Sequence, residues 1–410
     1  MRRGRKPAMR RLLMAEWRKL VGVRVLWGLL GLCVLANVAL AAVYAGSEAP
    51  TIRAAGEVTR VIGTTVDDDA WQRFAAWYAT READGEDAAG ERALAALAFA
   101  VESARDPFAG YDARSVGRRY ATAVDGDADG ADACGALSRL VRGKYELVET
   151  QAVRLSGVKA GLSLYAGEDT PSIHRGLCST IIGGVTWEAI VAAVLAMALL
   201  LGMEHATGAE PMVMASLAGR RRVLAAKLTV GLATGVAGFV VLMAAALVPY
   251  VTLTDVTDLW ASNVASGFNT MMTELAESQP FLTWADLTVG QYVALSMALS
   301  CAVVISFALL AGICGIYCRN SYAAVGLVAG LCLGLAAVLT ICADNGWWGA
   351  YHLLSLNPMY ALDVRARWFT DMGLKELVPW QETIAMTLSL LYLAAVLAVA
   401  LRRGVHRDLS

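Results

Sequence analysis

The sequence lacks the motifs that mark the commonest enzyme and metal sites. It has no G-x-x-x-x-G-K-[ST] phosphate loop, because the one Gly-Lys pair, Gly143-Lys144, lacks both the preceding glycine and the following hydroxyl. It has neither a G-x-S-x-G elbow nor a cysteine pair at zinc-finger spacing. The histidines are too far apart in sequence for an H-E-x-x-H site; they are His174, His205, His352 and His406. We therefore expect a chain that is not an enzyme and binds no cofactor of its own.

Positive charge is missing from one long segment and abundant in two others. Segment 252–288 contains no Lys or Arg but several acids, namely Asp255, Asp258, Glu274, Glu277 and Asp286. The first 24 residues are strongly basic, and Arg402, Arg403 and Arg407 follow the last apolar run. Lys and Arg near a membrane-spanning helix favour the cytoplasmic side. Segment 252–288 is therefore predicted to be extracellular and both termini cytoplasmic.

The composition is that of a membrane protein. Hydrophobic residues make up 57% of the chain, and the mean hydropathy is +0.52. Six apolar runs are long enough to cross about 30 Å of hydrocarbon as helices: 25–45, 181–202, 228–251, 289–317, 321–343 and 382–402. Run 25–45 is longer than a usual signal-peptide core and is predicted to be an anchor. The predicted fold is an all-α polytopic membrane protein with six transmembrane helices, placed in the cell membrane.

The remaining segments connect or flank these runs. Segment 1–24 is predicted to be a basic amphipathic helix at the inner membrane surface. Segment 46–180 is predicted to be a large, mostly helical extracellular domain, because apolar residues recur at helical spacing and Gly- and Asp-rich pieces separate them. Segment 344–381 is interrupted by Asn357 and Pro358 and is predicted to be extracellular and partly re-entrant. The cytoplasmic connection 203–227 and the tail 403–410 complete the order.

Two features of segment 46–180 suggest ligands or cross-links. Oxygen donors alternate through D-G-D-A-D-G at 125–130, as in the first half of a calcium loop; the carboxylates are Asp125, Asp127, Asp129 and Asp132. Ala136 stands where the loop needs a bidentate Glu, so a solvated acidic turn is the alternative. Cys134 and Cys178 both fall in this predicted outer segment, where they could form a disulfide or remain two thiols.

Two polar residues fall within predicted spans. Glu188 is an acid among apolar residues of the second span, and such a carboxyl is a functional candidate by default. Its position near the outer end also fits an interfacial acid. Asn37 in the first span could simply bond across helices.

The connection between the second and third spans has the most informative order of residues. Glu204 follows the span directly, Gly208 comes four residues later, an apolar stretch follows, and Arg220, Arg221, Arg222 and Lys227 lead into the next span. This order, together with A-E-W-R-K-L at 15–20, resembles the membrane subunits of ABC type-2 transporters. Ala209 stands where that family often has threonine, and the frequent proline before the arginines is missing.

The resemblance implies a permease subunit of an ATP-driven exporter. It implies a coupling segment that docks on a separate ABC ATP-binding subunit, with these residues: Glu204, Gly208, Glu210, Arg220, Arg221, Arg222 and Lys227. ATP and Mg would be bound by that ATPase, and a second permease chain would complete the path across the lipid bilayer; no nucleic-acid partner is expected. Alternatively, the arginines only set orientation and touch anionic lipid. A sensor or assembly protein, with a ligand-binding extracellular domain and no ATPase, is the rival function, while a secondary transporter usually shows internal repeats that are not evident here.

Overall fold

The computed structural model describes residues 9–81, 88–126, 131–208, 212, 220–266, 279–318 and 320–406. Within these ranges the regular structure is helical, and β-pairing is confined to isolated bridges between single residues. The long helices are α1 (Met9–Val21), α2 (Arg24–Ile62), α3 (Ala70–Arg81), α4 (Ala88–Glu102), α5 (Ala113–Gly126), α6 (Ala131–Gly157), α8 (Gly183–Ala206), α10 (Arg220–Thr254), α11 (Val289–Tyr317), α12 (Ser321–Asp344) and α15 (Gln381–His406). The short ones are α7 (Thr170–His174), a π-helical piece (Arg175–Ile182), α13 (Trp348–Leu354) and α14 (Pro358–Asp363).

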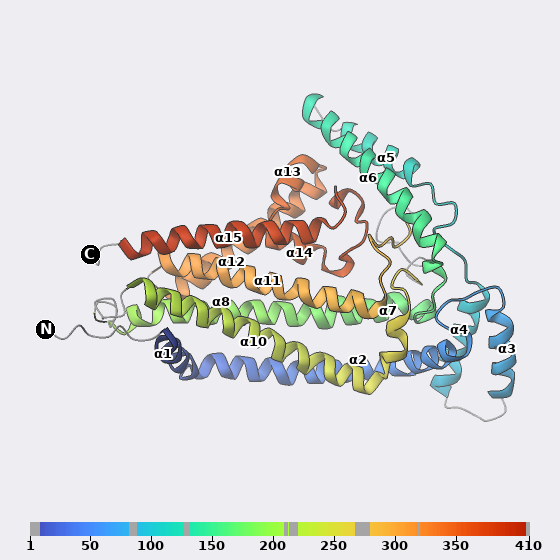
Figure 1. Ribbon diagram of the computed structural model, residues 1–410, viewed down its shortest axis with the longest axis horizontal. Coiled ribbons are helices and arrows are strands. Elements are labelled where there is room, and N and C mark those ends of the chain that lie inside the picture. The colour runs from blue at the N-terminus through green and yellow to red at the C-terminus, as the bar shows by residue number, and fades with distance from the viewer. Residues whose placement is uncertain are drawn as a thin grey trace.

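Six helices of the described chain are long and apolar enough to cross a membrane, as the sequence predicts for a multi-pass membrane protein. They are α2, α8 together with the turns before it, α10, α11, α12 and α15. They run side by side along the long axis of the molecule (Figure 1). Helix α8 lies at the centre of this bundle, packed against α10, α11, α12 and α2.

The two ends of the bundle differ in charge and in what covers them. One end, here called the basic end, carries α1, the start of α10 and the end of α15, with Arg24, Arg221, Arg222, Arg402 and Arg403 exposed on it. The described part of the chain begins and ends at this end, with α1 and the last turns of α15 (Figure 1). The other end, here called the domain end, carries α3 to α7 together with α13 and α14. Which end faces the cytoplasm stays a prediction from the charge distribution.

Two of the spans extend well beyond the predicted apolar runs. Helix α2 has 39 residues, about 58 Å at a rise of roughly 1.5 Å per residue, which exceeds the hydrocarbon thickness of about 30 Å. Its second half buries Ile52, Ala55 and Val58 against the domain end. Likewise α7, the π-helical piece and α8 form one continuous helix from Thr170 to Ala206. Both helices extend beyond the predicted boundaries at 45 and 181. Hydropathy detects only the apolar part of a helix, whereas the helix itself continues as long as its residues pack against other parts of the protein.

The domain end contains two cores. Helices α3 and α4 pack on the outer half of α2 and share the main core of the bundle. Helices α5 and α6 pair as a hairpin that reaches away from the bundle (Figure 1). They approach closely at Gly117, where an added Cβ would lie 2.5 Å from the Cβ of Tyr145. The hairpin core also contains Leu282 and Trp284 from the connection before α11, so segment 46–180 does not bury its hydrophobic residues alone.

Segment 344–381 is broken where the sequence predicts a break. Asn357 caps α14 by accepting a hydrogen bond from the Met359 amide at 2.7 Å. Pro358 follows at the first helical position, where its missing N–H costs nothing. Helix α14 packs against α12 and α15 at the domain end. Whether this segment re-enters a membrane stays a prediction.

Candidate functional site

Glycine 208, singled out by the sequence, ends helix α8 at the basic end. Its backbone φ is +67°, in the left-handed region that favours glycine. The Gly208 amide donates to the His205 carbonyl at 3.2 Å, and the Thr207 amide donates to the Met203 carbonyl at 3.1 Å. These bonds occupy carbonyls that a helix end leaves free. Gly208 thus marks where the chain leaves α8 and enters the connection to α10.

Four charged residues from three helices meet beside this helix end. Lys19 of α1 donates to Glu16 Oε1 at 2.7 Å and to Glu204 Oε1 of α8 at 2.6 Å. Lys227 of α10 pairs with the other oxygen of Glu204, and it also donates to the Leu200 carbonyl at 2.7 Å. We call Glu16, Lys19, Glu204 and Lys227 the ion cluster. It joins the A-E-W-R-K-L motif and the α8–α10 connection, which are about 185 residues apart in sequence.

The ion cluster is largely buried and balanced in charge. Lys227 is 1% exposed, Glu16 3% and Glu204 5%, whereas the Lys19 side chain is 33% exposed. Two carboxylates face two ammonium groups, so the cluster as a whole carries no net charge. Glu204 and Lys227 depend on each other most, because breaking a buried pair leaves an uncompensated charge at a cost of about 3–5 kcal/mol. The three helices are therefore expected to move together at this end.

A fourth helix touches the same end of α8. A Cβ added to Gly202 would lie 2.2 Å from the Ser321 hydroxyl oxygen and 2.9 Å from the Ser321 amide nitrogen. Ser321 begins α12, whose N-terminus is capped by Asn320 through a 2.9 Å bond from the Tyr322 amide. The close approach requires a glycine at 202. Displacement of the end of α8 would thus reach α12 as well as α1 and α10.

Of the other predicted coupling residues, two are exposed at the start of α10, and the side chains of two more lie outside the described residues. Arg221 and Arg222 are exposed at the start of α10, and neither has an acidic partner within the described ranges. The side chains of Glu210 and Arg220 lie outside the described residues. Lys227 and Glu204 face inward, so in this conformation they hold helices together rather than present charge to a partner.

The two predicted intramembrane polar residues meet each other. Asn37 Nδ2 of α2 donates to Glu188 Oε2 of α8 at 2.5 Å, and Asn37 also donates to the Cys33 carbonyl at 2.9 Å. Glu188 is sixteen positions before Glu204 in the same continuous helix, about 24 Å along its axis. The pair therefore lies far from the ion cluster, towards the domain end. It explains how a carboxyl and an amide within apolar spans obtain hydrogen-bond partners.

The predicted calcium and disulfide positions are only partly described. The side chains of Asp125, Asp127, Asp129 and Asp132 lie outside the described residues, as does that of Cys134. Cys178 is buried, with its sulfur 3.8 Å from His174 Nδ1, and forms no disulfide with another described cysteine. Calcium binding by the acidic turn and pairing of Cys134 stay predictions.

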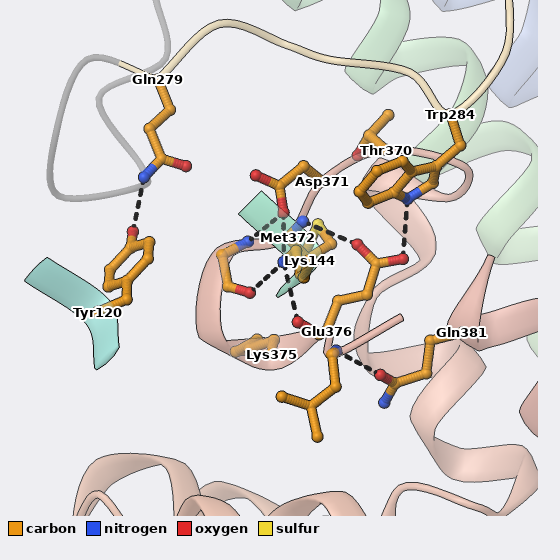
Figure 2. A network of polar contacts seen from close by, with 12 residues as sticks. Tyr120, Lys144, Gln279, Trp284, Thr370, Asp371, Met372, Lys375, Glu376 and Gln381 are labelled. Atoms are coloured by element: carbon orange, nitrogen blue, oxygen red, sulfur yellow. Dashed lines mark hydrogen bonds and ion pairs between the residues drawn. The ribbon is translucent and has the colours of Figure 1, made fainter. Parts of the chain in front are cut away.

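A second buried charge network, at the domain end, was not predicted from the sequence. Lys144 of α6 reaches Asp371 Oδ1 at 2.5 Å and donates to the carbonyls of Gly373 and Glu376 at 2.6 and 2.9 Å. The Glu376 carboxylate accepts from Trp284 Nε1 at 2.9 Å and from the Met372 amide at 3.2 Å. Figure 2 shows these groups converging from α6, the 280s and the 370s. We call Lys144, Asp371, Glu376 and Trp284 the Lys144 network; it fastens the α5–α6 hairpin to the connection before α15.

Burial in this network makes the charged form of the Glu376 carboxyl unfavourable. Burial raises the pKa of Glu376 well above its usual range, although Lys144 acts in the opposite direction. A carboxyl with a raised native pKa stabilises the fold below its unfolded pKa, near 4.5, and loses that contribution as the pH rises through the native value.

We predict that Glu376→Gln makes the pH dependence of stability shallower above about pH 5, because glutamine stays neutral. Thermal unfolding of the purified protein at pH 5, 6, 7 and 8 measures this. The stability of the variant relative to the wild type should rise with pH, whatever its absolute value. As a control, Glu146→Gln changes an exposed carboxyl of α6. A constant difference between Glu376→Gln and the wild type across this range would contradict the prediction.

The chemistry available at the basic end is electrostatic and mechanical. Within the described ranges no group of three His, Cys, Asp or Glu side chains is arranged to hold a metal ion. The site consists of a largely buried ion cluster, a glycine that ends α8, and two exposed arginines where α10 begins. Comparison with family models, curated proteins and solved structures finds no match to this chain.

Proposed function

We propose that this chain is the permease subunit of an ATP-driven exporter of the ABC type-2 class. The observation that carries the proposal is the ion cluster. It links α1, α8 and α10 at the point where the chain enters the α8–α10 connection, and two exposed arginines stand beside it. ATP and Mg would be held by a separate ATP-binding subunit that docks on this connection. A second permease chain would complete the transport path across the bilayer.

The geometry accounts for how a push on the connection would reach the spans. A force at Gly208 or Arg221 acts on the ends of α8 and α10, which the Glu204–Lys227 pair holds together. Lys19 passes the displacement to α1, and the close approach at Gly202 passes it to α12. Rigid-body motion of such a linked set is an established way to alternate between two states. The chemical identity of the exported molecule does not enter this argument.

The test is co-purification with an ABC ATP-binding subunit, and the first candidate to try is any P-loop ATPase that the neighbouring open reading frame encodes. Arg221→Ala combined with Arg222→Ala is expected to weaken binding of the ATPase roughly 30-fold, because removing both charges would cost about 2 kcal/mol of binding free energy. The ion cluster is untouched in this variant, so the protein should still fold. The measurement is the amount of ATPase retained on the immobilised chain across a range of ATPase concentrations.

The matched control is Arg402→Ala with Arg403→Ala, which removes two exposed arginines from the same end of the molecule but from α15. This variant should retain the ATPase. Equal retention by both double variants would show that the α8–α10 connection is not the dock. Failure of the wild-type chain to retain any such ATPase would instead favour the sensor or assembly function.

A further inference from the structure

A groove lies in the elbow between α1 and α2, next to the ion cluster but not part of it. Its walls are Trp17 and Val21 of α1 and Arg24 and Trp27 of α2, and its volume is about 490 Å³. The lining is mostly apolar, with one guanidinium at its edge. The tight turn at Gly22 and Val23 sets the two helices at an angle and so forms the groove.

The aromatic walls are held in place by the rest of the fold. The rings of Trp17 and Trp27 meet edge to face with centroids 6.0 Å apart. Trp27 Nε1 donates to the Leu20 carbonyl at 3.1 Å, which fixes its ring across the elbow. Behind them Leu20 and Leu26 are fully buried in a small core with residues of α8 and α10. The groove is therefore built on the bundle, although Trp17 and Trp27 themselves remain 38% and 37% exposed.

The polar edge of the groove carries unbalanced positive charge. The Arg24 side chain is exposed, and its guanidinium has no ion pair or hydrogen bond within the described part of the chain; the same holds for the guanidinium groups of Arg10, Arg11 and Arg18 of α1. The first turn of α2 contains no acid, and its N-cap Val23 offers no side-chain oxygen to the free amides. The helix dipole adds to the positive potential there.

The position of the groove along α2 sets its depth relative to a bilayer. The apolar stretch of α2 begins directly after Arg24. Tryptophan rings concentrate at the membrane interface, where one edge is apolar and the other is wet. Arg24 is then at the level of phosphate groups, while the tryptophan walls are at the level of glycerol and the first methylenes.

We propose that this groove binds one anionic phospholipid of the leaflet around the basic end. The phosphate lies against Arg24, and the glycerol and upper acyl chain lie on Trp17, Val21 and Trp27. A free phosphate ion would leave the apolar walls in water, and a zwitterionic lipid would gain less from the unbalanced arginines. Because α1 also supplies Lys19 to the ion cluster, the lipid would hold α1 in the position from which Lys19 reaches Glu204. The proposal requires a bilayer but does not depend on the exporter function.

The test is native mass spectrometry of the full-length chain in detergent, with phosphatidylglycerol, phosphatidylcholine or inorganic phosphate added separately. The wild type is expected to retain one phosphatidylglycerol more tightly than phosphatidylcholine and to retain no phosphate ion. Arg24→Gln should weaken retention of phosphatidylglycerol roughly fivefold, the share of one arginine near a charged headgroup. Trp17→Ala with Trp27→Ala should weaken both lipids by removing the walls.

The control is Arg402→Gln with Arg403→Gln, which removes more positive charge from the same end but leaves the groove intact. It should retain phosphatidylglycerol like the wild type. Equal retention of the two lipids by the wild type, or unchanged retention in Arg24→Gln, would overturn the proposal. Arg24→Gln alters an exposed side chain, so its result stands even where the double tryptophan variant fails to fold.

Discussion

Replacing Lys227 by methionine is expected to destabilise the protein by about 3–5 kcal/mol. Methionine fills much of the same volume, so the loss comes from charge. Glu204 would keep only Lys19 as a partner, and two buried carboxylates would then share one ammonium group that is itself one-third exposed. The Leu200 carbonyl would also lose its donor from Lys227. The measurement is the thermal unfolding midpoint of the purified chain in detergent.

Two further variants separate charge from packing. Arg222→Met changes an exposed cation of the same helix and should shift stability by no more than about 0.5 kcal/mol. Adding Glu204→Gln to Lys227→Met removes the unpaired charge and leaves Glu16 with Lys19, so the double variant should be more stable than Lys227→Met alone. If Lys227→Met unfolds at the wild-type temperature, the ion cluster does not hold these helices together.

Three of the predicted apolar runs begin where long helices begin. Helix α11 has the predicted bounds 289–317, and α12 and α15 begin within one residue of the predicted positions. The starts of α11 and α12 are fixed by N-caps, because the side chains of Thr288 and Asn320 accept hydrogen bonds from the first turns of these helices. Helix α2 continues past the predicted span 25–45, because its second half packs on protein at the domain end. Such a continuation carries no long apolar run that hydropathy could detect.

The sequence identifies the individual residues of the candidate site but not the contacts between them. Order and charge point to Glu204, Gly208 and Lys227 separately, and Glu16 and Lys19 belong to a motif at the other end of the sequence. Nothing in the spacing indicates that Lys19 reaches Glu204, because this contact depends on how α1 folds back beside α8 and α10. The Asn37–Glu188 bond is hidden for the same reason.

For the Lys144 network, neither the residues nor their contacts were identified from the sequence. In the sequence Lys144 is one cation of a charged domain, and Asp371 and Glu376 belong to a connection more than two hundred residues later. The one usable signal is that Lys144 lies between Val141 and Val148, on the apolar face of α6. A lysine on such a face is expected to find a buried partner, but the pattern does not identify which acid that is.

Lys144→Met is the second substitution with a large expected effect, about 3–5 kcal/mol of destabilisation. It leaves the Asp371 carboxylate buried without its cation and removes the donor to the carbonyls of Gly373 and Glu376. Because Lys144 joins α6 to the connection before α15, we expect these two segments to open locally at a lower free energy than global unfolding requires. Hydrogen exchange should therefore accelerate in α6 and in 370–377 more than in the spans.

Arg139→Met, on the same helix but exposed, is the control, because among the described residues its guanidinium bonds only to the Gly135 carbonyl of its own helix. Faster exchange confined to α6, with 370–377 unchanged, would mean that other contacts hold that connection in place. The full pattern would mean that one buried lysine sets how firmly the projecting hairpin is attached to the last span. In that case a ligand or partner that moves the hairpin would act on α15 through Asp371 and Glu376, which gives the domain end its own mechanical link to the bundle.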